Sequence, residues 1–484
     1  MGVVAKEICK GVMFTSIAKY SSILVNIIVT AILARVLQPS EFGVVALTTV
    51  MVSFFDLLGN MGLGPSIIQH KSLDNQDINT LFTLSLFIAI VFAAICYLSS
   101  GMVGLFYSNN QLPFLLKLLC FQIFFTISSI VPYSLLLKNK EFGIIAIIQV
   151  FSQLFLGICA VFSAYFGFGV YSLLIAPIGS SIILFISSLV YNVLKHNTSF
   201  RIYFRKNSVN KVLSFSIYQF LFNVVNYLSR NLDKLLIGKN ISMSELGYYE
   251  KSYRLMGLPL STISSVLNPT IQPVLSNYQN QKELLYNYVN SIITILSYVG
   301  FFLTPLLFFT SKELVLIVFG SQWVPAILIF QILSLSVFAQ TIDSASGPVM
   351  QSANEPQKLF LSGLICAIIN VFCIVLGAAV AKSIVWLACL MVIAFVFNVV
   401  ISLYYIYIMI FNKSFKYILR LFLKPLLGAI LTSMALWFIS LNSEMLPLIP
   451  SLLIKITIAL IVYFLYLFFI RALSISMIKQ LFIK

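Results

Sequence analysis

Three charged residues lie close together in an otherwise apolar stretch of the sequence. The segment NYLSRNLDKLLIGK, residues 226–239, contains Arg230, Asp233 and Lys234, although only 9% of the chain is charged. An arginine or lysine in the middle of a membrane helix costs roughly 2.5–3.5 kcal/mol on insertion scales. A water-filled cavity removes that cost, and an arginine facing such a cavity binds phosphate through its forked guanidinium group. These residue types therefore indicate chemistry with an anion.

The charges fall on a polar stripe when the sequence is wound at about 100° per residue. On a helix over 209–238, the face around Arg230 carries Ser216, Gln219, Asn223, Asn226, Asp233 and Lys234. A second stripe, on a helix over 12–35, contains Thr15, Lys19, Ser22, Asn26 and Thr30. A third, on a helix over 245–275, contains Glu250, Arg254, Ser261, Ser265 and Asn268, with Lys251 at its flank. We expect these faces to line a polar cavity.

The charges on the two later stripes do not balance. Four cations accompany two anions: Arg230, Lys234, Lys251 and Arg254 against Asp233 and Glu250. A cationic cavity suits an anionic substrate, and Lys19 is a further candidate from its own stripe. The structural alternative is local neutralisation, in which Arg230 pairs with Asp233 and Arg254 pairs with Glu250 to hold helices together.

Two further acids lie within expected membrane helices. Asp56 shares a helix face with Thr49, Ser53 and Asn60, and Asp343 lies near Ser336 and Gln340. An ionisable residue inside a membrane span is a candidate for carrying a proton or Na⁺. A hydrogen bond between packed helices is an equally good interpretation of either acid.

The remaining reactive residues show no catalytic or metal-binding pattern. The seven cysteines are scattered without a C-x-x-C pair, and His70 and His196 stand alone. Gly62-Leu63-Gly64 is too short for a nucleotide-binding loop. We therefore expect no enzyme activity, no catalytic residue, no metal site and no cofactor, apart from possible coupling to H⁺ or Na⁺.

The elements that must position these residues are membrane-spanning helices. Hydrophobic residues make up 60% of the 484, and apolar runs of roughly 20 residues recur along the whole chain. The runs predict an all-α integral membrane protein with about 14 transmembrane helices. The expected helices cover 12–35, 41–68, 79–106, 113–137, 142–166, 170–194, 209–238, 245–275, 284–310, 324–350, 357–380, 383–411, 417–440 and 447–471.

The basic residues predict which loops face the cytoplasm. Most of the 30 Lys and Arg fall in one set of alternating loops or at the two ends of the chain, and the opposite loops hold only Arg35, Lys239, Lys312 and Lys382. This asymmetry matches the positive-inside rule, so both termini are expected in the cytoplasm. The net charge of +16 is thus a topology signal, and no nucleic-acid partner is expected.

The chain also contains a weak internal repeat. At a shift of 204 residues, Ser40-Glu41-Phe42-Gly43 aligns with Ser244-Glu245-Leu246-Gly247, and Pro65 aligns with Pro269. An even number of helices separates the copies, which predicts two parallel, pseudo-symmetric bundles of about six helices each. The expected parts are an N-terminal lobe at 1–195, a basic inter-lobe loop at 196–210, a C-terminal lobe at 211–411, and two extra helices with a cytoplasmic tail at 412–484.

Two stretches resemble a known family. They are PSEFGVVALTTVMVSFFDLLGNMGLGPSIIQHKSL, residues 39–73, and RNLDKLLIGKNISMSELGYYEKSYRLMGLPLSTISSVLNPTIQPVLSNYQ, residues 230–279. Both are similar to Wzx-type polysaccharide biosynthesis flippases, and most to the colanic-acid and teichuronic-acid exporter branch. These proteins belong to the MATE-like multidrug, oligosaccharidyl-lipid and polysaccharide exporter superfamily.

The resemblance implies a MATE-like fold and a location in the bacterial cytoplasmic (inner) membrane. The implied activity is the transfer of polyprenyl-pyrophosphate-linked oligosaccharide repeat units, for O-antigen, capsule or exopolysaccharide, to the outer leaflet. The implied partners are that lipid-linked substrate, membrane lipids and other polysaccharide assembly proteins. The residues carried over are Arg230, Asp233 and Lys234 in R-N-L-D-K, and Lys251 and Arg254 in E-K-S-Y-R.

The mechanism expected from these features is alternating access, with the cations holding the pyrophosphate while the lipid tail stays in the bilayer. A peptidoglycan lipid II flippase is an alternative, since such a protein also has a basic cavity. A cation-coupled multidrug exporter of the same superfamily is another, although its cavity should be net acidic. No expected outer loop is long enough for the catalytic residues of a polymerase or ligase.

Overall fold

The computed structural model describes residues 2–60, 63–69, 73–205, 217–442 and 446–470. Every regular element in these ranges is a helix. Within them, 11 helices are long and apolar enough to cross a membrane, or 12 if a bent pair is counted as one span. The chain divides into two compact units, Met1–Gly247 (unit 1) and Tyr248–Lys484 (unit 2).

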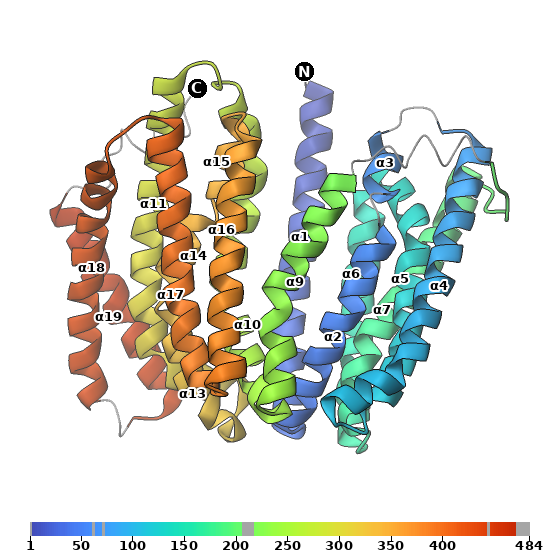
Figure 1. Ribbon diagram of the computed structural model, residues 1–484, viewed down its shortest axis with the longest axis horizontal. Helices are drawn as coiled ribbons and strands as arrows, with labels where there is room; N and C mark the ends of the chain where they lie inside the picture. The colour runs from blue at the N-terminus through green and yellow to red at the C-terminus, as the bar shows by residue number, and fades with distance from the viewer. Residues whose placement is uncertain (1, 61–62, 70–72, 206–216, 443–445, 471–484) are drawn as a thin grey trace. The chain divides into compact units, whose positions relative to one another are not determined.

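Unit 1 is a bundle of long helices (Figure 1). Its elements are α1 (Gly2–Val36), α2 (Pro39–Asn60), α3 (Leu63–Gln69), α4 (Asn75–Tyr107), α5 (Leu112–Lys138), α6 (Phe142–Tyr165), the 3₁₀ turn η1 (Gly169–Tyr171), α7 (Ser172–His196) and α9 (Ile217–Asn240). In this bundle α5 packs along α4 and α7, α6 packs on α1 and α7, and α9 lies against α2. Unit 1 also includes the first turn of α10 (Met243–Ser276).

The ends of α4 show how local sequence sets helix boundaries. The Asp74 side chain accepts a hydrogen bond from the Asp77 N–H, and the Asp77 side chain accepts one from the Asp74 N–H. This capping box satisfies two backbone donors that a helix start leaves free. At the other end, Ser108 takes a left-handed conformation, and its N–H bonds back into the last turn.

The segment after α7 is hydrogen-bonded along α4. Residues 199–205 are not helical, and the N–H groups of alternate residues donate to side-chain oxygens of α4. The bonds run from Arg201 to Asn79 Oδ1 (2.9 Å), from Tyr203 to Thr83 Oγ1 (3.0 Å) and from Arg205 to Thr80 Oγ1 (3.2 Å). Most of the basic segment expected as a loop at 196–210 is therefore held on unit 1 as far as residue 205.

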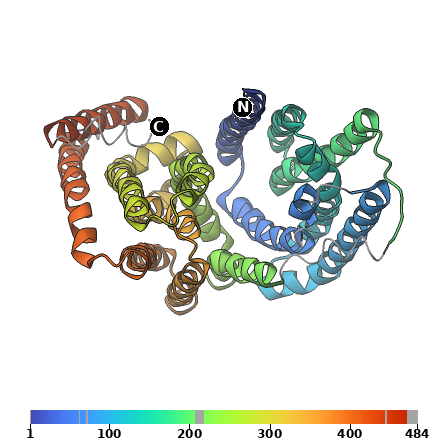
Figure 2. The same cartoon turned by 90° about the horizontal axis from the view of Figure 1, so that it is seen from above.

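Unit 2 contains the rest of α10 and the later helices. They are α11 (Lys282–Phe309), α12 (Ser311–Phe319), η2 (Ser321–Trp323), α13 (Val324–Ser334), α14 (Val337–Asp343), α15 (Ser346–Ser352), α16 (Pro356–Ile374), the π-helix η3 (Val375–Val380), α17 (Ile384–Leu403), the π-helix η4 (Tyr404–Ile410), α18 (Phe415–Asn442) and α19 (Leu448–Phe469). Seen from above in Figure 2, the red ribbons of α18 and α19 lie at one edge of this unit, where α18 packs on α11 and α19.

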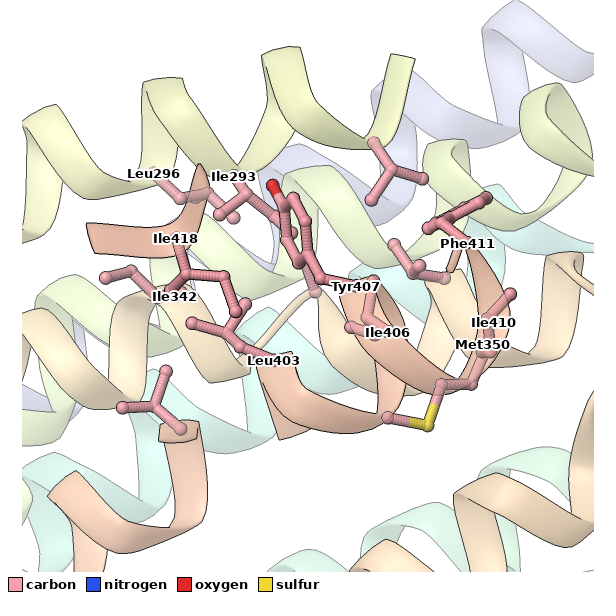
Figure 3. Close-up of a cluster of buried hydrophobic side chains, with 14 of the residues drawn as sticks. Ile293, Leu296, Ile342, Met350, Leu403, Ile406, Tyr407, Ile410, Phe411 and Ile418 are labelled. Carbon is pink, nitrogen blue, oxygen red and sulfur yellow. The ribbon is translucent and has the colours of Figure 1, made fainter. Parts of the chain in front are cut away.

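The core of unit 2 is formed by side chains of α11, α14, α17 and η4. Ile293, Leu403, Ile406 and Tyr407 all belong to one buried cluster (Figure 3). The hydroxyl of Tyr407 donates to Asn290 Oδ1 at 2.9 Å, so this buried polar group is paired.

The single helix expected over 324–350 is wrong. The structure breaks it into α13, α14 and α15, with a bend of 51° between Ser321–Ser334 and Val337–Ser352. The Phe338 N–H donates to Thr304 Oγ1 of α11 at 3.0 Å, and the Thr304 hydroxyl donates to the Gly300 carbonyl at 3.0 Å. A side chain inserted into the backbone ladder in this way is a known cause of a helix kink.

The expected count of about 14 spanning helices is matched only in part. The short helix α12 lies in a stretch expected to be a connection. The helices α9 and α10 stand at the expected positions, but their polar residues keep them outside the 11 apolar spans. The expected tail from Arg471 lies outside the described residues.

Candidate functional site

The charges on α9 differ in exposure. Arg230 is exposed, Lys234 is half-buried, and Asp233 is 4% exposed. The Lys234 N–H donates to Asp233 Oδ1 at 2.8 Å. In the described part of unit 1, Arg230 makes no ion pair, so its guanidinium group is available to an anion. Two bonds fix this part of α9: Tyr227 donates its hydroxyl to the Val50 carbonyl (2.6 Å), and Asn231 Nδ2 donates to the Tyr227 carbonyl (2.9 Å).

The charges on α10 belong to unit 2 and also differ in exposure. Arg254 is exposed and Glu250 is half-buried, whereas Lys251 is 5% exposed. The hydroxyl of Ser252 donates to the Ala326 carbonyl at 3.0 Å, which ties this turn of α10 to α13. Arg254 is thus the cation of this turn that presents most surface to water or to a ligand.

The polar stripe on α1 is described only in part. Lys19 is exposed, and the Thr30 hydroxyl donates to Asn26 Oδ1 at 3.4 Å. Several expected stripe residues have side chains outside the described residues: Thr15, Gln219, Asn223, Asn226 and Asn268; Ser216 lies outside them altogether. The structure therefore brings Arg230, Asp233 and Lys234 together on α9 and places Glu250, Lys251 and Arg254 within about one turn of α10.

The two intramembrane acids occupy different settings. Asp56 lies on α2 in unit 1, and its Oδ1 atom is buried without a hydrogen-bond partner among the described residues. Asp343 is the last residue of α14, within the broken span of unit 2. A buried carboxylate oxygen that lacks a partner is costly when it is ionised.

Sequence reasoning missed a buried ion pair between α12 and α19. Glu313 is 4% exposed and Lys455 is 5% exposed, and the two side chains form a salt bridge. Ser451 donates its hydroxyl to Glu313 Oε1 at 2.7 Å, and Lys455 also donates to the Phe309 carbonyl at 3.0 Å. The available signal was a lysine inside the very apolar run that forms α19.

Comparison with known proteins places these features in a family. The sequence model of the family described as "Polysaccharide biosynthesis protein" matches residues 32–328, which include both stretches quoted above. The succinoglycan biosynthesis transport protein ExoT of Rhizobium meliloti (strain 1021) is 24% identical over 90% of this chain and 87% of its own. The lipopolysaccharide biosynthesis protein WzxC of Escherichia coli (strain K12) is 24% identical over 85% of this chain and 84% of its own.

Solved structures share the fold. The lipid II flippase MurJ, in an inward closed conformation, superposes with a TM-score of 0.77 at 16% identity, covering 96% of this chain and 99% of that one. An inward-facing MATE family multidrug resistance transporter of the MOP superfamily superposes with a TM-score of 0.61 at 12% identity, covering 79% and 92%. The helical bundle is therefore MATE-like and MurJ-like, and because the family match covers more than half of the chain, this protein belongs to the polysaccharide biosynthesis protein family.

Proposed function

We propose that this protein is a flippase for polyprenyl-pyrophosphate-linked oligosaccharide repeat units in the bacterial cytoplasmic membrane. The observation that carries the proposal is the near full-length similarity to proteins named for polysaccharide transport, such as the succinoglycan biosynthesis transport protein of R. meliloti. A fold shared with a lipid II flippase supports it, since both substrates would combine a long lipid tail with a large polar head.

The cations of α9 and α10 are proposed to bind the pyrophosphate. Arg230 and Arg254 are exposed on helices of bilayer length, where a charge facing lipid is expensive. Each guanidinium group can form two parallel hydrogen bonds with phosphate oxygens. Lys234 and Lys19 would add charge without that geometry, and the buried Lys251 would act through the local field.

Transport is proposed to proceed by alternating access without covalent chemistry. The lobes at 1–195 and 211–411 would act as the two moving bodies, with both termini in the cytoplasm. Coupling to a proton at Asp56 is supported by the buried Oδ1 atom, which has no hydrogen-bond partner among the described residues, and Asp343, at the end of α14, is the candidate acid in unit 2. Removal of the product by polymerisation outside would drive the same cycle without an ion.

Inverted membrane vesicles offer a direct test. Labelled lipid-linked oligosaccharide is added to the outer face, which corresponds to the cytoplasmic side, and its protection from an impermeant glycosidase is followed. We expect protection with the wild type and loss of at least about tenfold in the initial rate for Arg230→Ala/Arg254→Ala, because two charge-assisted contacts disappear.

The matched control is Lys117→Ala/Lys424→Ala, which removes two exposed cations from other membrane helices, one in each unit. Its rate should remain at the wild-type level. Equal protection by both double variants would reduce Arg230 and Arg254 to structural residues. If the wild type protects none of several glycan donors, the same vesicles are tested with lipid II and with cationic drugs, and transport of either would replace the proposed substrate.

A further inference from the structure

A half-open apolar pocket lies within unit 1, between α2, α4, α5 and α9. Its volume is about 450 Å³, in the range of cavities that hold small ligands. Val50, Cys96 and Leu116 form a buried floor, each no more than 5% exposed. Met102 of α4 and Leu228 of α9 form an exposed rim, at 76% and 44%.

The side chains of Tyr227, Ser99 and Cys96 in this pocket are already paired with protein. Tyr227 donates its hydroxyl to the Val50 carbonyl, and Ser99 donates to the Cys96 carbonyl at 3.1 Å. The thiol of Cys96 points at the Leu116 carbonyl at 4.0 Å. A polar ligand bound here would lose its hydrogen bonds to water without replacing them, which costs free energy. A hydrocarbon has no such bonds to lose. The lining therefore selects an apolar chain.

A cation stands at one end of this pocket. Lys239, in the last turn of α9, places its ammonium group 4.4 Å from the ring centroid of Phe106, and it also donates to the Phe106 carbonyl. Phe106 itself lines the pocket. An ammonium group has three N–H donors, so two remain for an anionic head group. In the topology proposed above, Lys239 lies at the outer-leaflet end of α9.

We propose that this pocket holds part of the polyprenyl chain of the lipid-linked glycan while Lys239 contacts its phosphate at the outer leaflet. The assignment rests on the proposed flippase function and adds a lipid-tail site to it. The lining carries rings from three helices, at Phe54 and Phe55, at Phe106 and Tyr107, and at Tyr227. A methyl-branched, unsaturated chain fills so broad a pocket more completely than a straight acyl chain. The denser packing increases the number of van der Waals contacts and so the binding free energy.

The test uses the purified full-length protein in nanodiscs and a polyprenyl monophosphate that carries a diazirine near the middle of its chain. After illumination, we expect labelled peptides from α4 and α9. Met102→Trp fills the rim, and it should lower the yield about tenfold because several methylene groups lose their burial. Leu228→Trp approaches the same space from α9 and should do the same.

Leu98→Trp is the matched control. Leu98 lies one turn from Met102 on α4, is 78% exposed and does not line the pocket, so its indole adds the same bulk to the lipid side. The labelling yield of this variant should equal that of the wild type. Lys239→Gln should reduce the preference for the monophosphate over an uncharged polyprenol probe about tenfold, since one charge-assisted bond is lost.

Besides an absence of labelling in the wild type, two results would overturn the assignment. One is equal labelling of Met102→Trp and Leu98→Trp. The other is equal labelling of the same peptides by a diazirine-bearing phosphatidylglycerol, which would make the pocket a site for ordinary bilayer lipid. The glycosidase-protection assay on the same variants separates the two proposals. Flipping without pocket labelling removes only the tail site, and pocket labelling without flipping in the wild type removes only the proposed function.

Discussion

Gly43 and Gly247 lie against each other at the point where α2 and α10 begin. A Cβ atom on Gly43 would overlap the carbonyl oxygen of Met243, and a Cβ atom on Gly247 would overlap that of Pro39. The contact is reciprocal, because at a shift of 204 residues Pro39 aligns with Met243 and Gly43 aligns with Gly247. Two copies of one motif that pack through the same surface make such an isologous contact, which supports the proposed repeat.

Gly43→Ala and Gly247→Ala are each expected to destabilise the protein by about 1–3 kcal/mol, because the added methyl group meets backbone atoms that cannot rotate away. Thermal unfolding in detergent measures the effect. Gly143→Ala is the control, since a Cβ atom at this position meets nothing within 4 Å. This substitution only reduces the backbone freedom of helix α6. A melting temperature for Gly43→Ala equal to that of Gly143→Ala would contradict the close contact.

Lys455→Ala is expected to cost about 3–5 kcal/mol, because it leaves the buried Glu313 carboxylate without its counter-charge. Lys455→Met combined with Glu313→Leu removes both charges and keeps the volume, so it should be close to neutral. Unfolding temperatures of the single and double variants provide the comparison. A double variant as unstable as Lys455→Ala would show that the charge pair itself is required.

The stability of unit 1 should depend on pH through Glu141, which lies between α5 and α6. Burial acts to raise the pKa of this carboxyl, but hydrogen bonds from Lys195 and Tyr191 and the charges of Lys195 and His196 outweigh it, so its pKa falls below the ordinary 4.5. The ion pair with Lys195 is 3.0 Å long.

Because the folded pKa of Glu141 is depressed, its contribution is complete above the unfolded value and is lost as the pH falls through the folded value. Melting curves between neutral and acidic pH should therefore fall more steeply for the wild type than for Glu141→Gln. Glu355→Gln is the control for general charge loss, because it removes the carboxylate of another ion pair, formed with Lys358 at the start of α16. Parallel curves for wild type and Glu141→Gln would contradict the assignment.

Thr304→Val should destabilise unit 2 by about 1–3 kcal/mol, because the Phe338 N–H at the break between α13 and α14 loses its acceptor. Thr294→Val is the matched control on the same helix, since the Thr294 hydroxyl donates to the Asn290 carbonyl one turn earlier and, among the described residues, to no other helix. Hydrogen exchange at the Phe338 amide gives a local readout. Unchanged protection of that amide in Thr304→Val would remove this explanation of the kink.

Much of the fold could be predicted because hydropathy is a local signal. The ends of α5, α6, α11 and α19 lie within two residues of those expected, since each apolar run is bounded by polar or turn-forming residues. The break after Ser334 could not be predicted in this way. It depends on Thr304 and Gly300, which lie on another helix and are about 30 residues earlier in the sequence.

The charged residues of the candidate site could be predicted from the sequence, but the exposure of each side chain could not. Arg230 and Lys251 are both cations in apolar runs, and both are expected from the sequence to face the polar cavity. In the structure Arg230 is exposed and Lys251 is buried, because exposure depends on which face of the helix its neighbours cover. The apolar pocket was missed for the same reason, as its lining comes from four helices.

The salt bridge between Glu313 and Lys455 also has a consequence for biogenesis. The glutamate is synthesised 142 residues before the lysine, so α12 is already present when α19 leaves the ribosome. A lone lysine inside an apolar span opposes release from the insertion channel into lipid. The Glu313 carboxylate, already in place, offsets the cost of moving the Lys455 charge into lipid. The entry of α19 into the membrane therefore depends on an earlier part of the same chain.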